Sequence, residues 1–350
     1  MSDVDVPDAV ESYRIPQVVR LGPNLFGAAF FLMKLVPARH ILRRARATGA
    51  MGPDTVVVET TSGTFGLGLA LECALIGNPL LLVGDPVIDA RLRRQVVDLG
   101  ARVEIVTTPE QDGGIQAARL NRLAEIAATL PDHFCPQQYT NPANPDSYEL
   151  VADVLADRVG QIDCLVGPVG SGGSMCGTVR QLRSQFSDLH AVAVDTHGSV
   201  LFGQRDAGRE LRGLGNSLMP ANLDHTVFDE VHWVGAAQAY EATRGLHRRH
   251  ALFMGPTSGA AFSVARWWAK EHPAAKTVVM LPDQGHRYID TVYDDEWLGS
   301  RGMRLEDPSD ITAPQWVTEP VDLTRCWSAI KWKRRGSSEH LTTDHGLAWS

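Results

Sequence analysis

The residue types best suited to binding a charged ligand directly follow the apolar run at 56–59. The segment TTSGT, residues 60–64, combines hydroxyl side chains with a glycine at the start of a helical pattern. Ligands bind at the carboxyl ends of parallel strands, where the next helix presents unpaired N–H groups. Thr61 and Ser62 would add hydroxyl donors, Gly63 would let the backbone approach closely, and the helix dipole favours a carboxylate or phosphate. The segment predicts an anion cradle, with simple capping of the helix as the alternative.

A second cradle is predicted within residues 165–182, which again run from an apolar stretch through a glycine-rich turn into a helical pattern. Backbone amides in such a turn can wrap a phosphate. The turn contains Gly170, Ser171, Gly172, Gly173 and Ser174. A dinucleotide-binding turn is the alternative, but the GxGxxG order is absent, the turn lies mid-chain, and the acidic residue expected some 20 positions on is Asp195 at best.

These turns need a scaffold of alternating strands and helices, and the chain has that pattern. Apolar runs separated by amphipathic segments lie at 56–59, 78–85, 101–106, 161–168, 189–195 and 276–283. Strands buried on both faces between helices are typical of parallel α/β architecture. With 350 residues, the chain is expected to form two domains. After about residue 300 the pattern fades into a polar tail, expected to be an appended or partly mobile segment.

Composition narrows the class of partner. The net charge of −8 and the pI near 5.8 argue against nucleic acid and anionic membranes, so a small-molecule partner is favoured. The five cysteines lack CxxC spacing and are interpreted as free thiols in a reducing cytoplasm. The acidic N-terminus is not expected to be a signal peptide, and no apolar run is long enough to predict a membrane span. His340 and His345 lack the spacing of metal ligands, so no metal site is predicted.

Five motifs, in order along the chain, resemble those of the pyridoxal-phosphate-dependent cysteine synthase and cystathionine β-synthase family. They are ETTSGTFGLGLA (59–70), PQQYTNPANP (136–145), GSGGS (170–174), GLGNS (213–217) and GPTSGAA (255–261). The resemblance covers roughly residues 14 to 298. It implies fold type II, the tryptophan synthase β-like class, with two parallel-sheet α/β domains, and a homodimer. The smaller, mobile domain would be 38–145, the larger cofactor-binding domain 1–37 with 146–300, and 301–350 a C-terminal extension.

The family requires a lysine that links to the cofactor aldehyde, about 25 residues before the glutamate of the first motif. Counting back from Glu59 gives Lys34, the only lysine before Lys270. Its apolar surroundings would lower the pKa of the amine and make it a usable base, whereas a snorkelling lysine at a helix end is the alternative. By resemblance, Lys34 would hold the cofactor as an aldimine and remove the substrate Cα proton.

The resemblance also assigns the remaining roles. Residues 170–174 would bind the cofactor phosphate, Thr257 the pyridine nitrogen and Thr64 the 3′-oxygen of pyridoxal 5′-phosphate. Thr61, Ser62, Gly63 and Gln138 would bind the substrate carboxylate. Arg212, just before the GLGNS loop, is the candidate for the carboxylates of a second amino acid substrate.

The implied reaction is β-replacement on an activated L-serine, O-phospho- or O-acetyl-L-serine, through an aminoacrylate. Stretches 194–203, 209–211 and 281–298 resemble a branch of the family that uses an amino acid amine such as L-glutamate in siderophore synthesis. A sulfide-using cysteine synthase and a non-catalytic paralogue that binds the cofactor are the alternatives.

Some positions depart from the family pattern. Thr64 stands where the family has asparagine, and the polar flank of the family lysine is replaced by NLFGAAFFLMKLVPAR (24–39). The chain between 18–21 and Lys34 is interpreted as too short for the strand that the family has there.

Overall fold

The computed structural model describes residues 6–61, 63–86, 88–111, 114–211, 213–303, 305, 313–320 and 327–336. The chain divides into two compact units, the first comprising Met1–Ile15 and Leu32–Ser147 and the second Pro16–Phe31 and Tyr148–Ser350. Each unit has its own sheet of mainly parallel strands, as the alternating pattern predicts. The mobility expected of residues 38–145 stays a prediction.

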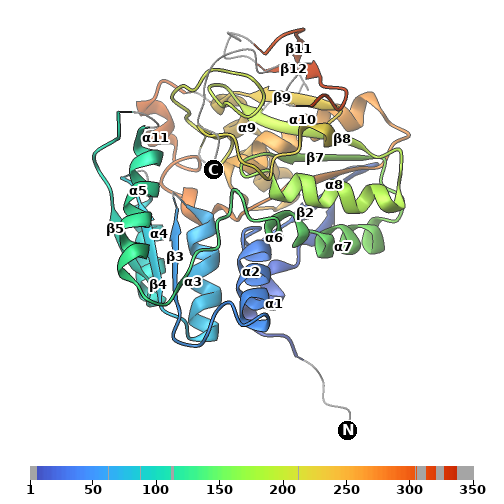
Figure 1. The fold of residues 1–350 in the computed structure, drawn as a ribbon. Coiled ribbons are helices and arrows are strands. Elements are labelled where there is room, and N and C mark those ends of the chain that lie inside the picture. Colours follow the sequence, from blue (N-terminus) through green and yellow to red (C-terminus); the bar gives the residue numbers. More distant parts are fainter. Residues whose placement is uncertain are drawn as a thin grey trace. The chain divides into compact units, whose positions relative to one another are not determined.

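The first unit contains a four-stranded parallel sheet of order β5-β4-β3-β6. Its strands are β3 (Val56–Thr60), β4 (Leu80–Gly84), β5 (Arg102–Ile105) and β6 (His133–Phe134). Its helices are α1 (Ala9–Arg14), α2 (Leu35–Ala47), α3 (Thr64–Ile76), α4 (Ala90–Asp98), α5 (Gly114–Thr129) and α6 (Ala143–Asp146). Helices α3, α4 and α5 contact the strands of this sheet (Figure 1). Helix α3 ends where Gly77 adopts a left-handed conformation, at φ 80°.

The second unit contains an eight-stranded sheet of order β1-β2-β10-β7-β8-β9-β12-β11. Its strands are β1 (Gln17–Arg20), β2 (Leu25–Ala29), β7 (Cys164–Pro168), β8 (His190–Thr196), β9 (Glu230–Val234), β10 (Thr277–Leu281), β11 (Gln315–Trp316) and β12 (Ser328–Lys331). Its α-helices are α7 (Glu149–Val159), α8 (Gly173–Gln185), α9 (Ala236–His250), α10 (Pro256–Glu271) and α11 (Asp295–Ser300), and 3₁₀ turns lie at His225–Val227 and Gly285–Tyr288. Within this sheet, the five neighbouring strands β2, β10, β7, β8 and β9 run parallel. The carboxyl ends of β7, β8 and β10 therefore lie at one edge of the sheet.

Strand β2 corrects one expectation. The chain before Lys34 was predicted to be too short for a strand there, but Leu25–Ala29 forms one. The backbone N–H groups of Leu21 and Gly22 both donate to Leu25 O, at 2.8 and 3.1 Å, and close a tight turn between β1 and β2. An antiparallel hairpin needs only such a turn, which is why the short segment suffices. The same strand then pairs in parallel with β10.

The tail beyond residue 300 also contributes to the sheet. Strand β12 pairs antiparallel with β9, and Trp332, 1% exposed, lies next to it with its N–H donating to Asp229 O at 2.8 Å. This part of the tail is therefore integrated into the second unit, while residues 337–350 lie outside the described residues. The four described cysteines, Cys73, Cys135, Cys164 and Cys176, are free thiols, and Cys326 is outside the described residues.

Candidate functional site

Lys34 lies at the N-cap of α2, where the chain turns into the helix. Loss of hydration on burial lowers the pKa of its amine from the ordinary 10.5 to about 8. Helix α3 packs against this helix start, because a Cβ atom placed on Gly68 would lie only 2.8 Å from Lys34 O. A glycine at this position thus allows α2 and α3 to approach closely beside the lysine. The amine can lose its proton near neutral pH, as a nucleophile or base must.

The hydroxyl-rich turn lies between β3 and α3, as expected. Thr61 is 3% exposed, and its Oγ1 accepts hydrogen bonds from the N–H groups of Gly63 and Gly66, both at 3.1 Å. The hydroxyl of Thr61 therefore caps the first turn of α3, which was the alternative interpretation of this residue. Thr64 is the first residue of α3. Ser62 lies outside the described residues, so its predicted role stays a prediction.

Gln138 lies in the same unit and is brought to the end of β3 by a buried carboxylate. The Gln138 N–H donates to Glu59 Oε2 at 3.3 Å, while Glu59 Oε1 accepts from the N–H of Thr60 at 2.8 Å. On the other side of the segment, Asn144 Nδ2 donates to Gln138 O at 2.6 Å. Two segments predicted to bind the substrate carboxylate are thus connected through Glu59. Sequence reasoning used Glu59 only to count back to Lys34 and gave it no role.

The glycine-rich turn of the second unit follows β7, also as expected. Gly172 is the N-cap of α8 and has φ 83°, a conformation that favours glycine. A Cβ on Gly172 would lie 2.7 Å from Leu223 Cα, so no other residue fits there without a shift. Gly170 is more open, since the nearest atom to a Cβ there is Gly213 O at 3.7 Å. Ser171 is 6% exposed, and Gly173 and Ser174 open the first turn of α8, whose N–H groups can bind an anion.

Thr257 lies in the first turn of α10 and is 4% exposed. A Cβ on Gly213 would lie 3.5 Å from Thr257 Oγ1, and Gly213 O is also the neighbour of Gly170. The structure therefore brings together the turn after β7, the loop at 213 and the start of α10 within the second unit. Arg212 lies outside the described residues, so its predicted role stays a prediction.

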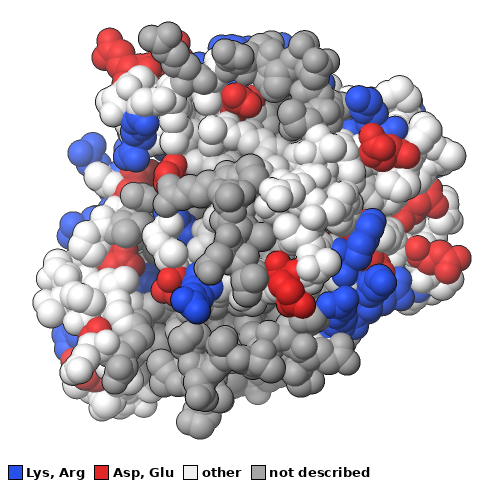
Figure 2. Space-filling view, turned by 90° about the horizontal axis from the view of Figure 1, so that it is seen from above, with Lys and Arg blue, Asp and Glu red and all other residues white. Residues whose placement is uncertain are grey.

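Other features add no further candidate to this set. A cavity of about 600 Å³ lies beside Thr196, Gly235 and Trp327, and none of the predicted site residues that the structure describes lines it. In the described part of the chain, no group of three His, Cys, Asp or Glu residues could hold a metal ion, and no helix is long and apolar enough to cross a membrane. On the face in Figure 2, described Lys and Arg side chains lie among Asp and Glu rather than in one extended basic surface.

Comparison with known proteins identifies the family. Residues 33–283 match the family model described as pyridoxal-phosphate dependent enzyme. The chain belongs to this family and is a pyridoxal-phosphate-dependent enzyme of the cysteine synthase-like group. Its fold is fold type II, so the predicted family and fold class are confirmed.

Particular relatives are more informative than the family model. A protein from Cupriavidus metallidurans named N-(2-amino-2-carboxyethyl)-L-glutamate synthase is 35% identical over 279 residues, which cover 78% of this chain and 82% of the relative. A protein of the same name from Ralstonia nicotianae is 36% identical over 265 residues, covering 75% and 78%. Among solved structures, a hydrogen sulfide-producing enzyme from Fusobacterium nucleatum matches with a TM-score of 0.75 at 24% identity, covering 81% of this chain and 100% of that one.

The residues present fit the cofactor that the family implies. An amine with a pKa of about 8 suits attachment to an aldehyde, because the uncharged form is the nucleophile. The turn at 170–174 leaves the first N–H groups of α8 available for a phosphate. Thr257, a neutral hydroxyl close to that turn, suits a ring nitrogen that carries no proton.

Proposed function

We propose that the chain catalyses β-replacement on an activated L-serine, O-phospho- or O-acetyl-L-serine, with an amino acid amine such as L-glutamate as the nucleophile. The observation that carries this proposal is the identity of 35% and 36% to two relatives over at least 75% of the chain. The name of those relatives describes a glutamate whose nitrogen carries an aminocarboxyethyl group, which is the product expected from serine β-replacement. Siderophore or other secondary metabolite synthesis is the corresponding biological role.

The proposed residue roles follow the chemistry of the side chains. When bound, pyridoxal 5′-phosphate withdraws electrons from the substrate Cα, which makes the Cα proton removable and the β-substituent a leaving group. Lys34 would accept and return that proton, since its amine loses its charge near pH 8. Residues 170–174 would hold the phosphate and Thr257 the ring nitrogen, with Thr64 donating to the ring oxygen.

The substrate carboxylate would be bound by the turn at 61–63 and by Gln138. The Thr61 hydroxyl already caps α3, and the N–H groups of Thr61 and Gly63 already donate to Val83 O and to Thr61 Oγ1. The Gln138 side-chain amide and Ser62 would therefore contribute the donors to the substrate. Arg212 would bind a carboxylate of the amine substrate, a contact that sulfide does not need. Loss of that contact in Arg212→Ala should therefore affect only the second half of the reaction.

The test is a screen of purified protein, supplied with cofactor, against O-phosphoserine and O-acetylserine. Each serine is combined with L-glutamate or with sulfide, and products are identified by mass spectrometry, with Lys34→Ala as the inactive control. The expected result is a glutamate adduct that Lys34→Ala does not form. Cysteine from sulfide as the sole product would make the protein a cysteine synthase. Cofactor absorption with no product from any pair would make it a non-catalytic paralogue.

We also propose that the protein acts as a homodimer on small amino acids in the cytoplasm. Family membership supports small-molecule substrates. Sedimentation velocity of the purified protein tests the dimer, and a mass near twice 38.1 kDa is expected. A single species at the monomer mass would contradict it.

A further inference from the structure

The Glu59 carboxylate lies near the end of β3, is 3% exposed, and is bonded by backbone N–H groups and by the Thr60 side chain. Its Oε1 atom accepts from the N–H of Thr60 and its Oε2 atom from the N–H of Gln138, which is 79 residues further along the chain. One side chain thus holds the strand end that leads into the hydroxyl turn and the separate segment that carries Gln138. Both belong to the first unit.

The segment around Gln138 needs such a support. Gln137 has φ 53°, in the left-handed region that residues other than glycine rarely adopt. A backbone of this kind persists only where its surroundings hold it. Here Asn144 donates to Gln138 O at 2.6 Å and Asn141 Nδ2 to Pro136 O at 2.9 Å, which secures the carbonyl groups. The N–H side of the segment depends on Glu59.

The charge state of Glu59 decides how well it can do this. An ionised carboxylate offers strong acceptor sites on both oxygens, whereas in a protonated one the O–H oxygen becomes a donor and only a weak acceptor for a facing N–H. Burial raises the pKa of Glu59 to about 7, although the N–H groups of Thr60, Gln138 and Gln137 each oppose that rise.

The ionisable groups around Glu59 do not change that state. Burial also raises the pKa values of Cys135 and Tyr139, so both stay neutral through the physiological range. Asp85 from the end of β4 and Arg119 from α5 lie 3.2 Å apart as an ion pair, which adds no net charge near Tyr139. Glu59 is therefore the group of this cluster whose charge changes near neutral pH.

We propose that Glu59 is a positioning residue whose ionised carboxylate holds the Gln137–Gln138 segment and the start of the hydroxyl turn in the geometry that receives the substrate carboxylate. The part that concerns substrate rests on the proposed function. The hydrogen bonds from the segment to Glu59 do not depend on the proposed function, because they lie within this chain. The experiment therefore has one arm without substrate and one arm with turnover.

The first arm measures amide hydrogen exchange of the peptide that contains Gln137 and Gln138, in the protein without substrate. Glu59→Gln keeps the shape but imitates the protonated acid, because one acceptor oxygen becomes an NH₂ donor. Loss of a hydrogen bond to a charged group should speed exchange of these amides about ten- to hundredfold at pH 8. Wild-type protein should approach the same rate, corrected for intrinsic exchange, when the pH falls to 6.

Glu72→Gln is the matched control for this arm. Glu72 is as buried as Glu59 and lies in the same unit, but its partners are the guanidinium groups of Arg39 and Arg43. Its loss should leave the exchange of residues 137–138 unchanged. Equal protection of these amides in wild type at pH 8 and pH 6 would overturn the proposal, even where Glu59→Gln fails to fold.

The second arm compares steady-state kinetics of the same variants. Glu59→Gln should retain the visible absorption of bound cofactor, raise the KM for the activated serine about ten- to hundredfold, and change kcat little. The acid limb in the pH profile of kcat/KM should disappear in Glu59→Gln if Glu59 causes it. Asp195 and Lys34, whose pKa values are about 7 and about 8, are unchanged in this variant, so a limb caused by either of them would remain. An unchanged KM and limb would overturn the proposal. Exchange as expected with no turnover in wild type would refute the proposed function alone.

Discussion

Lys34 shows at the scale of one residue how function opposes stability. The amine is partly desolvated, and burial alone accounts for the fall of its pKa from 10.5 to about 8. The folded chain binds this proton less tightly than the unfolded chain does. Folding is therefore less favourable at any pH at which the unfolded chain carries the proton, that is, below about 10.5. The folded protein is therefore destabilised at neutral pH by the same property that makes the amine reactive. Stability should rise as the pH is raised from about 8 towards 10.5.

Lys34→Met tests this directly. Methionine keeps the length and the apolar stem of the side chain but cannot be charged or bind an aldehyde. The free energy of unfolding without cofactor should increase by about 1–3 kcal/mol at pH 7. The visible absorption of bound cofactor and all turnover should be lost. Urea unfolding and an absorption spectrum measure both effects, and a variant that is less stable than wild type at pH 7 would contradict the account.

Gly170 allows a test of the phosphate turn that Gly172 does not. A side chain at Gly172 would meet Leu223 backbone, whereas a Cβ at Gly170 has its nearest neighbour at 3.7 Å. Gly170→Asp should therefore fold, yet place a negative charge against the cofactor phosphate. Repulsion of about 3 kcal/mol should weaken cofactor binding about a hundredfold.

The matched control for the phosphate turn is Gly170→Ala, which adds the Cβ without the charge. It should bind cofactor far better than Gly170→Asp, as measured by equilibrium titration. If both variants bind like wild type, the phosphate is bound elsewhere.

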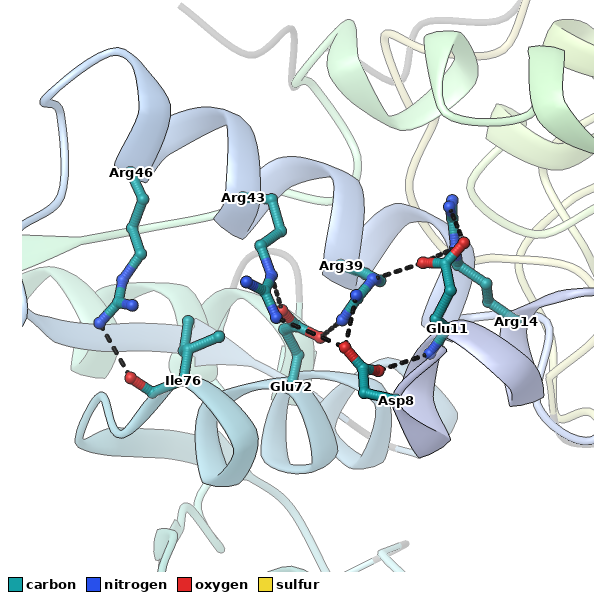
Figure 3. A network of polar contacts seen from close by, with 8 residues as sticks. All are labelled: Asp8, Glu11, Arg14, Arg39, Arg43, Arg46, Glu72 and Ile76. Atoms are coloured by element: carbon teal, nitrogen blue, oxygen red, sulfur yellow. Dashed lines mark hydrogen bonds and ion pairs between the residues drawn. The ribbon is translucent and has the colours of Figure 1, made fainter. Parts of the chain in front are cut away.

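At the scale of elements, α2 and α3 are joined by ion pairs between the middle of α2 and the second half of α3. Figure 3 shows Arg39 and Arg43 of α2 reaching Glu72 of α3, at 2.7 and 2.5 Å. The Glu72 side chain is 0% exposed. Arg39 also contacts Asp8 and Glu11 at the start of the chain, at 2.7 and 2.8 Å, and these carboxylates are about one-third exposed. Removal of the buried Glu72 carboxylate should therefore cost more stability than removal of either of the partly exposed carboxylates of Asp8 and Glu11.

Glu72→Gln and Glu11→Gln should separate these contributions. The first leaves the Arg39 guanidinium without its buried carboxylate and should reduce the free energy of unfolding by about 3 kcal/mol. The second removes a carboxylate that is about one-third exposed and should cost less than about 1 kcal/mol. Chemical unfolding of both variants at low and high salt gives the comparison, and only the Glu11→Gln effect should disappear at high salt. Equal losses in the two variants would contradict the assignment.

The sequence predicted the strands that form long apolar runs between helical patterns, and it missed β2, which lies in a short hairpin, and strands with buried polar residues such as β9. Strand β9 has the sequence EVHWV, which reads as half polar, yet all five residues are buried because Glu230 and His232 bond to each other. Strand β12 lies in a polar tail, and only its pairing with β9 makes it a strand.

The same limit applies to the site. The turns at 61–64 and 170–174 were predictable because each is local, lying between a strand and a helix. The hydrogen bond between Gln138 and Glu59 joins residues that are 79 positions apart in the sequence, so no local sequence pattern predicts it. The only signal was an acidic residue at the end of an apolar run.

At the scale of the whole molecule, a segment outside the matched family region completes the larger sheet. The family match ends at residue 283, while β12 adds to the edge of the sheet beyond β9. Trp327 precedes β12, and its Nε1–H donates to His232 Nδ1 at 3.1 Å. Because the indole can only donate, Nδ1 must be unprotonated, and the Nε2–H then donates to Glu230 at 3.1 Å. Neutral His232 therefore ties the tail to the sheet.

Acid should loosen that tie. Burial lowers the pKa of His232 below its ordinary 6.5, against the opposing effect of Glu230 and in the same direction as Lys331 and His190. The stability from the neutral ring is therefore fully present above pH 6.5 and is lost as the pH falls below it. Protonation of Nδ1 would set it against the indole N–H. Tryptophan fluorescence and protease sensitivity of the tail should both change between pH 7 and pH 5.

His232→Gln cannot be protonated in this range and should remove most of the pH-dependent change in these two signals, at the cost of a tail that is looser at pH 7. The control is His250→Gln at the end of α9, because burial lowers the pKa of His250 too, but its ring contacts Phe262 rather than the tail. That variant should keep the wild-type response of the tail to acid. If His250→Gln abolishes the response and His232→Gln does not, the attachment of β12 is independent of His232, and the acid sensitivity belongs to α9.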